Sequence, residues 1–250
     1  MKSVKSSTKC TIPQIMKKIV IIGASGHGSV VLDCIKQEGR YEVVGFIDSY
    51  LKTNQFHCGQ KILGNEYNLP NLIEKFGISG GIIAIGDNWT RKKVCERILQ
   101  IVPEFNFISS VHPDSTIGTN VKIGQGTVVM PGAIVNANCE IGNFCILNTS
   151  CSLDHDSQIK QFSSLAPRSC AGGNLFLGSF SAIGLGTNII ENIKISEHSV
   201  VGAGSLVINN IESYSVAYGS PARTVRRRDA GEPYLGRNLN GTVIPLIARN

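Results

Sequence analysis

The sequence predicts two folded parts, a small α/β domain with a Rossmann-like βαβ unit and a parallel β-helix that follows it. Two observations lead to this prediction. The first is a six-residue repeat that runs through residues 115–210 without an insertion. The second is a glycine-rich turn at residues 23–28, between an apolar run and an amphipathic segment. The length of 250 residues allows one large domain or two small ones, which agrees with this division.

The N-terminal part has the order expected of a nucleotide-binding βαβ unit. Residues 18–22 are an apolar run that predicts a buried strand, and the glycine turn follows it. Residues 29–39 have apolar side chains at helical spacing, and residues 41–48 predict a second strand that ends in an acid, Asp48. Glycines let a phosphate approach the helix N-terminus, and the acid can reach a ribose hydroxyl. Because the turn reads GxxGxG and not GxGxxG, we do not expect NAD or FAD.

The same domain continues through a third strand and a second helix. Residues 81–85 predict a strand that runs into Gly86, Asp87 and Asn88, and residues 89–99 predict a helix. Residues 105–110 predict a last strand, and Pro113 marks the seam before the repeats. Asp48 and Asp87 end strands at the same carboxyl edge, where open α/β folds bind ligands. Asp and Asn also form ordinary turns, which is the alternative reading of these residues.

The repeat itself predicts the β-helix, because no helix has a period of six and a simple strand has a period of two. An apolar residue occupies the third position of all sixteen blocks, and Gly and Asn are expected to form the corners. The third-position residues are Ile117, Ile123, Val129, Val135, Ile141, Leu147, Leu153, Ile159, Leu165, Ala171, Leu177, Ile183, Ile189, Ile195, Val201 and Val207. We expect these side chains to point inward and to stack on their counterparts one coil away.

The domain limits follow from these patterns. We predict a loose N-terminus, an α/β domain, a β-helix and a C-terminal tail, at residues 1–16, 17–111, 112–224 and 225–250. The tail begins near Arg226, Arg227 and Arg228, which could meet a phosphate or form a solvated face or a subunit contact. The rest of the tail is polar and rich in Gly and Asn, and its pattern predicts no role.

Composition excludes several classes of function. The net charge of +6 is mild and dispersed, and aromatic residues make up only 6%, so we expect no nucleic-acid partner. No apolar run could span a membrane, and the basic N-terminus lacks the apolar core of a secretory signal. These features predict a soluble, cytoplasmic protein without membrane insertion. The eight cysteines include no CxxC pair, and Cys139, Cys145 and Cys151 are expected to be buried, reduced thiols that do not stack on one another.

Histidines supply the main candidates for chemistry. None of the five is spaced as a ligand pair, so we expect no metal site. His155 lies between Asp154 and Asp156, and two carboxylates favour the protonated form of the ring and can orient it. This arrangement suits a general base, although a plain surface histidine in an acidic corner is the alternative. His27, in the glycine turn, could bind a diphosphate or a sugar, or only cap the helix.

Taken in order, these motifs resemble a known family. GASGHG, FIDS, AIGDN, the repeats with LDHD, then CAGGN and GSPAR are similar to the bacterial sugar acyltransferases of the PglD and NeuD type. The resemblance is closest to UDP-4-amino-sugar N-acetyltransferases and covers about residues 18–225. It implies a left-handed coil, against the usual right-handed crossover. It also implies a homotrimer, with acetyl-CoA in the groove between neighbouring coils and a UDP-linked amino sugar on the α/β domain.

The resemblance assigns roles to individual residues. On the α/β domain, the residues implied to bind the nucleotide sugar are Ser25, Gly26, His27, Asp48, Ser49, Gly86 and Asp87. On the coil, the residues implied to act in transfer or to contact the coenzyme are His155 as base, Asp156 as its acid partner, Leu185 and Ala203. Ser164 stands where the family commonly has a histidine that contacts the acetyl group, and a serine can donate a hydrogen bond there but carries no charge.

The expected reaction is direct acetyl transfer from acetyl-CoA to a sugar amine in a ternary complex. O-acetylation of a sialic-acid-like sugar is one alternative, since a hydroxyl and an amine need the same base. A non-catalytic nucleotide-sugar-binding scaffold is another. Serine or maltose acetylation is less favoured, because proteins with those activities lack the N-terminal nucleotide unit.

Overall fold

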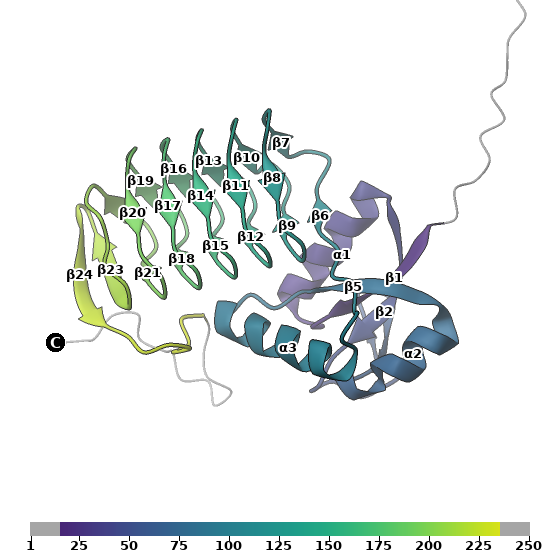
Figure 1. The fold of residues 1–250 in the computed structure, drawn as a ribbon. Coiled ribbons are helices and arrows are strands. Elements are labelled where there is room, and N and C mark those ends of the chain that lie inside the picture. Colours follow the sequence, from purple (N-terminus) through teal and green to yellow (C-terminus); the bar gives the residue numbers. More distant parts are fainter. Residues whose placement is uncertain (1–15, 236–250) are drawn as a thin grey trace, which may run out of the picture.

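The computed structural model describes residues 16–235, and Figure 1 shows a small α/β domain packed beside one end of a long coil. The predicted loose N-terminus, apart from residue 16, lies outside the described residues, as does the tail beyond residue 235. Within residues 16–235, no helix is long and apolar enough to cross a membrane.

The α/β domain is built on a sheet with the strand order β3-β4-β2-β1-β5. Its strands are β1 (Lys17–Ile22), β2 (Tyr41–Ile47), β3 (Phe56–His57), β4 (Gln60–Gly64) and β5 (Ile78–Ile83). All pairs are parallel except the β3–β4 hairpin. The helices are α1 (Gly26–Glu38), the 3-10 turn η1 (Glu66–Asn68), α2 (Leu69–Phe76) and α3 (Asn88–Ile101).

Two hydrophobic clusters cover the two faces of this sheet. Alternate residues of β1 point to opposite faces, so Ile19 and Ile21 pack with α1 while Val20 and Ile22 pack with α2 and α3. Each cluster also includes side chains of the coil, such as Ile146 in one and Phe144 in the other. The α/β domain is therefore fixed on the coil by a shared core.

The coil confirms the predicted left-handed parallel β-helix. Residues pair with partners eighteen positions away, so that Ile134 pairs with Ser152 and Val135 with Leu153. Three hexads therefore make one coil, and the two-residue strands form three faces.

Face 1 contains β6 (Ser110–Val111), β9 (Val128–Val129), β12 (Ile146–Leu147), β15 (Ser164–Leu165), β18 (Ala182–Ile183) and β21 (Val200–Val201), and ends in the hairpin of β23 (Ser215–Gly219) and β24 (Ala222–Arg227). Face 2 contains β7 (Thr116–Ile117), β10 (Ile134–Val135), β13 (Ser152–Leu153), β16 (Cys170–Ala171), β19 (Asn188–Ile189) and β22 (Leu206–Val207). Face 3 contains β8 (Lys122–Ile123), β11 (Glu140–Ile141), β14 (Gln158–Ile159), β17 (Phe176–Leu177) and β20 (Lys194–Ile195). The α/β domain packs on face 1.

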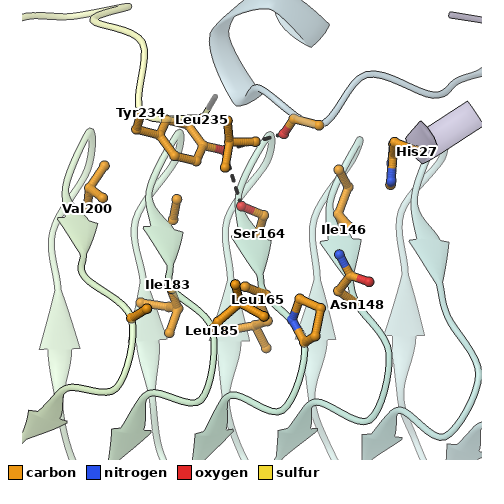
Figure 2. A pocket seen from close by; sticks show the side chains of 16 residues that line it. His27, Ile146, Asn148, Ser164, Leu165, Ile183, Leu185, Val200, Tyr234 and Leu235 are labelled. Atoms are coloured by element: carbon orange, nitrogen blue, oxygen red, sulfur yellow. Dashed lines mark hydrogen bonds between the residues drawn. The ribbon is translucent and has the colours of Figure 1, made fainter. Parts of the chain in front are cut away.

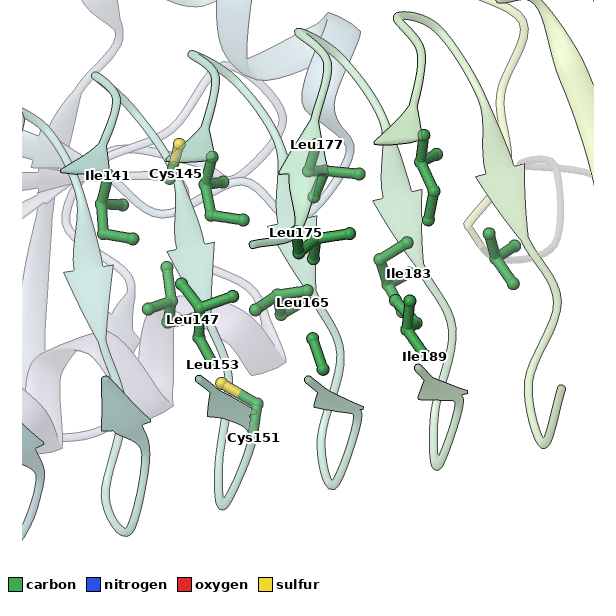
Figure 3. Packing of buried hydrophobic residues seen from close by; sticks show 14 of the residues in the cluster. Ile141, Cys145, Leu147, Cys151, Leu153, Leu165, Leu175, Leu177, Ile183 and Ile189 are labelled. Carbon is green, nitrogen blue, oxygen red and sulfur yellow. The ribbon is translucent and has the colours of Figure 1, made fainter. Parts of the chain in front are cut away.

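The third-position residues fill the interior as predicted (Figure 3). Val129 through Val207 are buried at every block, whereas Ile117, at the open first coil, is 37% exposed. Cys139, Cys145 and Cys151 are free, fully buried thiols of the same core. Burial raises the pKa of Cys145 to about 11 and that of Cys151 to about 12, so both stay protonated.

The corners correct one expectation. The sixth residue of every hexad from Asn120 to Gly204 has a positive φ, and many of these residues are neither Gly nor Asn. One column of corners holds aromatic rings that stack on one another. These rings are Phe144, Phe162, Phe180, His198 and Tyr214. Stacking and burial of the rings compensate for the left-handed backbone that glycine would adopt more easily.

Several element predictions are wrong in detail. The predicted strand at 105–110 does not form, because Phe107 makes only an isolated bridge to Gly81 and Ser110–Val111 already belongs to face 1 of the coil. Helix α1 begins at Gly26, inside the glycine turn and before the predicted start. The hairpin β3–β4 and helix α2 lie in a stretch where no element was predicted. β24 runs to Arg227, past the predicted end of the coil domain.

Candidate functional site

Two pockets share Gly86, one within the α/β domain and one between this domain and face 1 of the coil. The first, here called the edge pocket, has a volume of about 450 Å³ and opens at the carboxyl ends of β1, β2 and β5. The second, the coil pocket, has a volume of about 280 Å³ and lies between face 1 and the α/β domain. Carboxyl edges of parallel sheets are where open α/β folds bind ligands, so the edge pocket lies where one is expected.

The edge pocket contains four of the residues assigned from the sequence, namely Ser25, Asp48, Ser49 and Gly86. The Asp48 carboxylate already accepts three backbone N–H bonds, from Ala24 at 2.8 Å, Tyr50 at 2.8 Å and Leu51 at 3.0 Å. It therefore holds the pocket loops in place. Its predicted contact with a ribose hydroxyl stays a prediction.

Other residues of the edge pocket were not found from the sequence. Ser49 donates a hydrogen bond to the carboxylate of Glu66, which is 3% exposed and lies 3.3 Å from the Arg97 guanidinium. Lys93 and Arg97 are four residues apart on α3, so they lie on one side of the helix and bring positive charge to the pocket. Helical spacing could have placed these two cations together, but nothing in the sequence pointed to Glu66.

Gly26 and Asp87 lie outside the lining of both pockets. Gly26 is the first residue of α1, and Asp87 is the N-cap of α3. The Asp87 Oδ1 atom accepts a hydrogen bond from the backbone of Thr90 at 2.8 Å, while Oδ2 is buried without a partner among the described residues. The structure thus gives Asp87 a capping role, and its predicted contact with substrate is untested.

The coil pocket has a mostly apolar wall made by outward residues of face 1 and by the corner that follows (Figure 2). Ser164 lies at its centre, and Leu185 and Ala203 line the corner, so these three predicted residues meet in one pocket. The polar side chains that line it are His27, Asn148, Ser164 and Tyr234. A few polar groups in an apolar pocket are typical of a site that orients a small molecule.

His27 belongs to the coil pocket and not to the edge pocket. Burial, with a smaller contribution from the charge of Arg91, lowers the pKa of this imidazole to about 4. The ring is therefore neutral at physiological pH. Its Nε2 atom is buried and has no hydrogen-bond partner among residues 16–235, and the residue lines the coil pocket.

Arg91 fixes the junction between the two domains. Its guanidinium is fully buried and donates hydrogen bonds to Phe144 O at 2.9 Å, Ile85 O at 2.8 Å, Gly86 O at 3.0 Å and Asn88 Oδ1 at 2.6 Å. It thereby holds the Gly86 loop against the coil. The sequence contained a signal for this role, because helical spacing puts Arg91 on the buried side of α3 with Val94 and Ile98.

His155 lies in the corner between face 2 and face 3. Its Nδ1 atom is 2.7 Å from Asp156 Oδ2, and the Asp156 Oδ1 atom accepts from Asn138 Nδ2 at 3.1 Å. The Asp156 hydrogen bond is the main cause that raises the pKa of His155, and the charge of Asp154 acts in the same direction. With Nδ1 engaged, Nε2 is the nitrogen available for proton transfer.

The next coil leaves room for this imidazole. Gly173 lies eighteen residues after His155, and a Cβ at that position would come within 2.7 Å of both Cε1 and Nε2 of the ring. Gly173 is thus a residue of the site that the register of the repeat could have revealed. Half of the His155 side chain is exposed, at 53%.

One chain does not bring all the predicted residues together. The edge pocket is lined by the α/β domain and the coil pocket lies over face 1, whereas His155 and Asp156 lie in the corner between faces 2 and 3 and line neither pocket. Among the residues that the structure describes, no group of three or more His, Cys, Asp or Glu side chains is placed to hold a metal ion.

Both parts of the chain match known proteins. Residues 18–98 match the family model "PglD N-terminal domain", and residues 114–149 match "Bacterial transferase hexapeptide (six repeats)". UDP-N-acetylbacillosamine N-acetyltransferase of Bacillus subtilis (strain 168) is 32% identical over 121 residues, which are 46% of this chain and 52% of that protein. The match therefore spans about half the length of this curated relative.

Solved structures match over a longer stretch. A variant of perosamine N-acetyltransferase from Caulobacter crescentus, in complex with CoA and GDP-perosamine, is 30% identical with a TM-score of 0.78, covering 84% of this chain and 97% of that one. The acetyltransferase domain of PglB from Neisseria gonorrhoeae FA1090, in complex with acetyl coenzyme A, is 29% identical with a TM-score of 0.77, covering 84% and 100%.

A PglD-type α/β domain joined to a hexapeptide coil defines a class of sugar N-acetyltransferases. The chain belongs to this family.

Proposed function

We propose that the protein transfers the acetyl group of acetyl-CoA to the amino group of a nucleotide-linked amino sugar, with a UDP-linked 4-amino sugar as the expected acceptor. The observation that supports this most is the meeting of the edge pocket and the coil pocket at Gly86. A nucleotide in the edge pocket and a thioester in the coil pocket would bring the sugar and the acetyl group to the same place. The names of the relatives point to the same chemistry.

The two domains divide the work in this proposal. The α/β domain, residues 17–111, holds the nucleotide, and Lys93 and Arg97 supply positive charge for its phosphates. The coil domain, residues 112–224, holds acetyl-CoA along the corner of Leu185 and Ala203. The neutral His27 ring hydrogen-bonds the diphosphate or the sugar through Nε2 and adds no charge.

His155 acts as the general base. The acceptor amine attacks the thioester carbonyl carbon, a C–N bond forms, and His155 Nε2 takes a proton from the nitrogen. Asp156 holds Nδ1 and stabilises the imidazolium that results. Backbone N–H groups of the coil, with Ser164, stabilise the oxyanion until the C–S bond breaks and the coenzyme A thiolate leaves. Transfer is direct within a ternary complex, so no cysteine is acylated.

This mechanism needs a second copy of the chain. Because His155 lies away from both pockets of its own chain, a neighbouring copy must place its His155 at the coil pocket. A homotrimer, with one site at each interface between coils, fulfils this requirement.

The test is a panel of acceptors with acetyl-CoA, read by the release of free thiol. The panel contains UDP-linked 4-amino sugars, GDP-linked 4-amino sugars and a CMP-linked sialic-acid-like sugar. We expect thiol release with a nucleotide-linked amino sugar and a product acetylated on nitrogen. Release only with the sialic-acid-like sugar would show O-acetylation, and binding of nucleotide sugars without any thiol release would show a scaffold. Either result contradicts the proposal.

A further inference from the structure

The C-terminal segment of residues 228–235, here called the strap, crosses from the end of the coil to the α/β domain and ends in the coil pocket (Figures 1 and 2). We propose that the strap is a wall of the acceptor site and that the Tyr234 hydroxyl hydrogen-bonds the sugar of the acceptor. This inference rests on the proposed function, because it assumes that the sugar spans the junction at Gly86. Apart from Arg228, the sequence predicted no role for this segment.

The strap is held by specific contacts at its start. Glu232 pairs with Arg226 through two hydrogen bonds, of 2.8 and 3.2 Å. The buried guanidinium of Arg228 donates to His198 O at 3.2 Å and to Glu232 O. Arg226 and Arg228, at the end of β24, therefore make hydrogen bonds within the chain. In particular, Arg228 is neither the phosphate contact nor the solvated residue that the sequence suggested.

The middle of the strap fits against α3 without room for a side chain. Gly231 has a φ of 76°, and a Cβ there would lie 2.3 Å from Trp89 Nε1. Only glycine combines this left-handed backbone with such a close approach. The path of the strap is thus set by packing against the first turn of α3.

The end of the strap places Tyr234 between the two domains. Its ring packs against Ala182 and Val200 of face 1, and the residue is 8% exposed. Its hydroxyl lies 3.3 Å from Ser164 Oγ, accepts from Asn88 N at 3.3 Å and donates to Gly86 O at 3.4 Å. The hydroxyl therefore lies at Gly86, the residue that both pockets share.

These contacts leave the hydroxyl able to take a new partner. The contacts with Ser164 Oγ and Gly86 O are longer than the usual 2.7–2.8 Å of an O–H···O bond, and the bond from Asn88 N is longer than the usual 2.9–3.0 Å of an N–H···O bond, so all three are weak. Burial raises the pKa of Tyr234 to about 12, so the phenol is protonated and can donate. The neighbouring Ser164 can donate or accept, and most of the remaining wall is apolar. A sugar hydroxyl at the junction would find its polar partners here.

The test compares Tyr234→Phe with Tyr67→Phe, an exposed tyrosine that lines neither pocket. Calorimetry on the full chain measures the Kd of a UDP-linked 4-amino sugar and of UDP alone, with the GDP pair in parallel. Tyr234→Phe is expected to weaken binding of the nucleotide sugar by about tenfold, because a buried polar partner is lost, and to leave the Kd of the nucleoside diphosphate unchanged. Gly231→Ala, which displaces the strap, is expected to show the same pattern, and Tyr67→Phe no change.

Equal or tighter binding of the nucleotide sugar by Tyr234→Phe overturns the proposal, and tighter binding would mark the strap as an obstruction. Equal loss for the sugar nucleotide and the free diphosphate also overturns it, since the effect would then not lie at the sugar. Because binding needs no turnover, a wild-type chain that binds the nucleotide sugar but releases no thiol contradicts the proposed function alone. A wild-type chain that binds no nucleotide sugar contradicts both.

Discussion

At the scale of single residues, the position of His155 depends on its own neighbours in the chain and on the absence of a side chain at Gly173. Asp156 fixes one ring nitrogen, and Gly173 leaves the space that the other edge of the ring occupies. Asp154 accepts the backbone N–H of His155 at 2.8 Å, which fixes the corner itself. The proposed base is therefore oriented before any substrate binds.

Gly173→Ala tests whether the position of the His155 ring matters for the reaction. The glycine does not have a positive φ, so alanine suits its backbone, but the new Cβ would overlap the imidazole. We expect kcat to fall by about tenfold or more, because a misplaced base loses much of its contribution to the rate. Thermal unfolding and the KM for acetyl-CoA serve as controls and are expected to stay the same. Unchanged kcat would show that the ring position does not matter.

Asp156→Asn tests the electrostatic effect of the Asp156 carboxylate on His155. A general base must be neutral, and Asp156 is the main cause that raises the pKa of His155. Removing the carboxylate lowers this pKa, so the acid limb of the kcat/KM profile is expected to move to lower pH. The plateau is also expected to fall, because the imidazolium loses its partner. Asparagine tolerates the φ of 57° at this position, so the corner can persist.

The measurement is kcat/KM against pH for wild type and variant. An acid limb that stays in place, or that moves to higher pH, contradicts the assignment of Asp156 as the partner of the base.

At the scale of elements, the stacked corner column ties the coil to the α/β domain. The Phe162 ring lies 4.8 Å from Phe144 and 5.5 Å from Phe180, nearly parallel to both. Phe144 and Phe162 also belong to the cluster beneath α2 and α3. Since Arg91 of α3 bonds the Phe144 carbonyl, this column and the Gly86 loop form one packed unit.

Phe162→Ala is expected to lower the free energy of unfolding by about 3 kcal/mol, the usual cost of a large core truncation. Phe176→Ala is the matched control, because Phe176 lies on the outer surface of face 3 and is only half-buried. Denaturant unfolding of both variants measures the difference. A loss for Phe162→Ala no larger than for Phe176→Ala would contradict a structural role for the column.

An element could be predicted from the sequence where a local hydrophobic pattern marks it. The hexads carry their register in the sequence, so residues such as Val129 and Leu153 could be placed inside the coil without a structure. Residues 105–110 alternate like a strand, but Phe105 and Phe107 satisfy that alternation by packing under α3. The β3–β4 hairpin has short strands, of two and five residues, and Ile62 is the one large side chain of the hairpin that is fully buried, so the local hydrophobic signal was weak.

At the scale of the whole molecule, the candidate site could be predicted only in parts. Local motifs identified His155, Asp48 and Ser164, because each lies in a distinctive short sequence. Tyr234 and Glu66 could not be found this way, since their roles depend on contacts with residues far away in the chain. That the two pockets meet at Gly86 is likewise a property of the domain packing.

The placement of His155 has a consequence for the assembly. In the proposed mechanism a chain with an intact pocket needs the histidine of a neighbour, so two defects on different chains should complement each other. His155→Ala removes the base and leaves both pockets of its own chain intact. Ala203→Trp fills the coil pocket from an exposed corner position and leaves His155 in place.

Thiol release with acetyl-CoA and a nucleotide-linked 4-amino sugar, measured for each variant alone and for mixed assemblies, tests the central claim most directly. Each variant alone is expected to lose activity. For His155→Ala the rate should fall by ~10²–10⁴-fold, the usual contribution of a general base. For Ala203→Trp the rate should fall because the pocket is blocked. Assemblies formed by co-expression of both variants are expected to regain part of the wild-type rate, because some interfaces then combine an intact pocket with an intact His155. Near-normal turnover by His155→Ala assemblies, or no recovery in the mixed ones, would contradict the account.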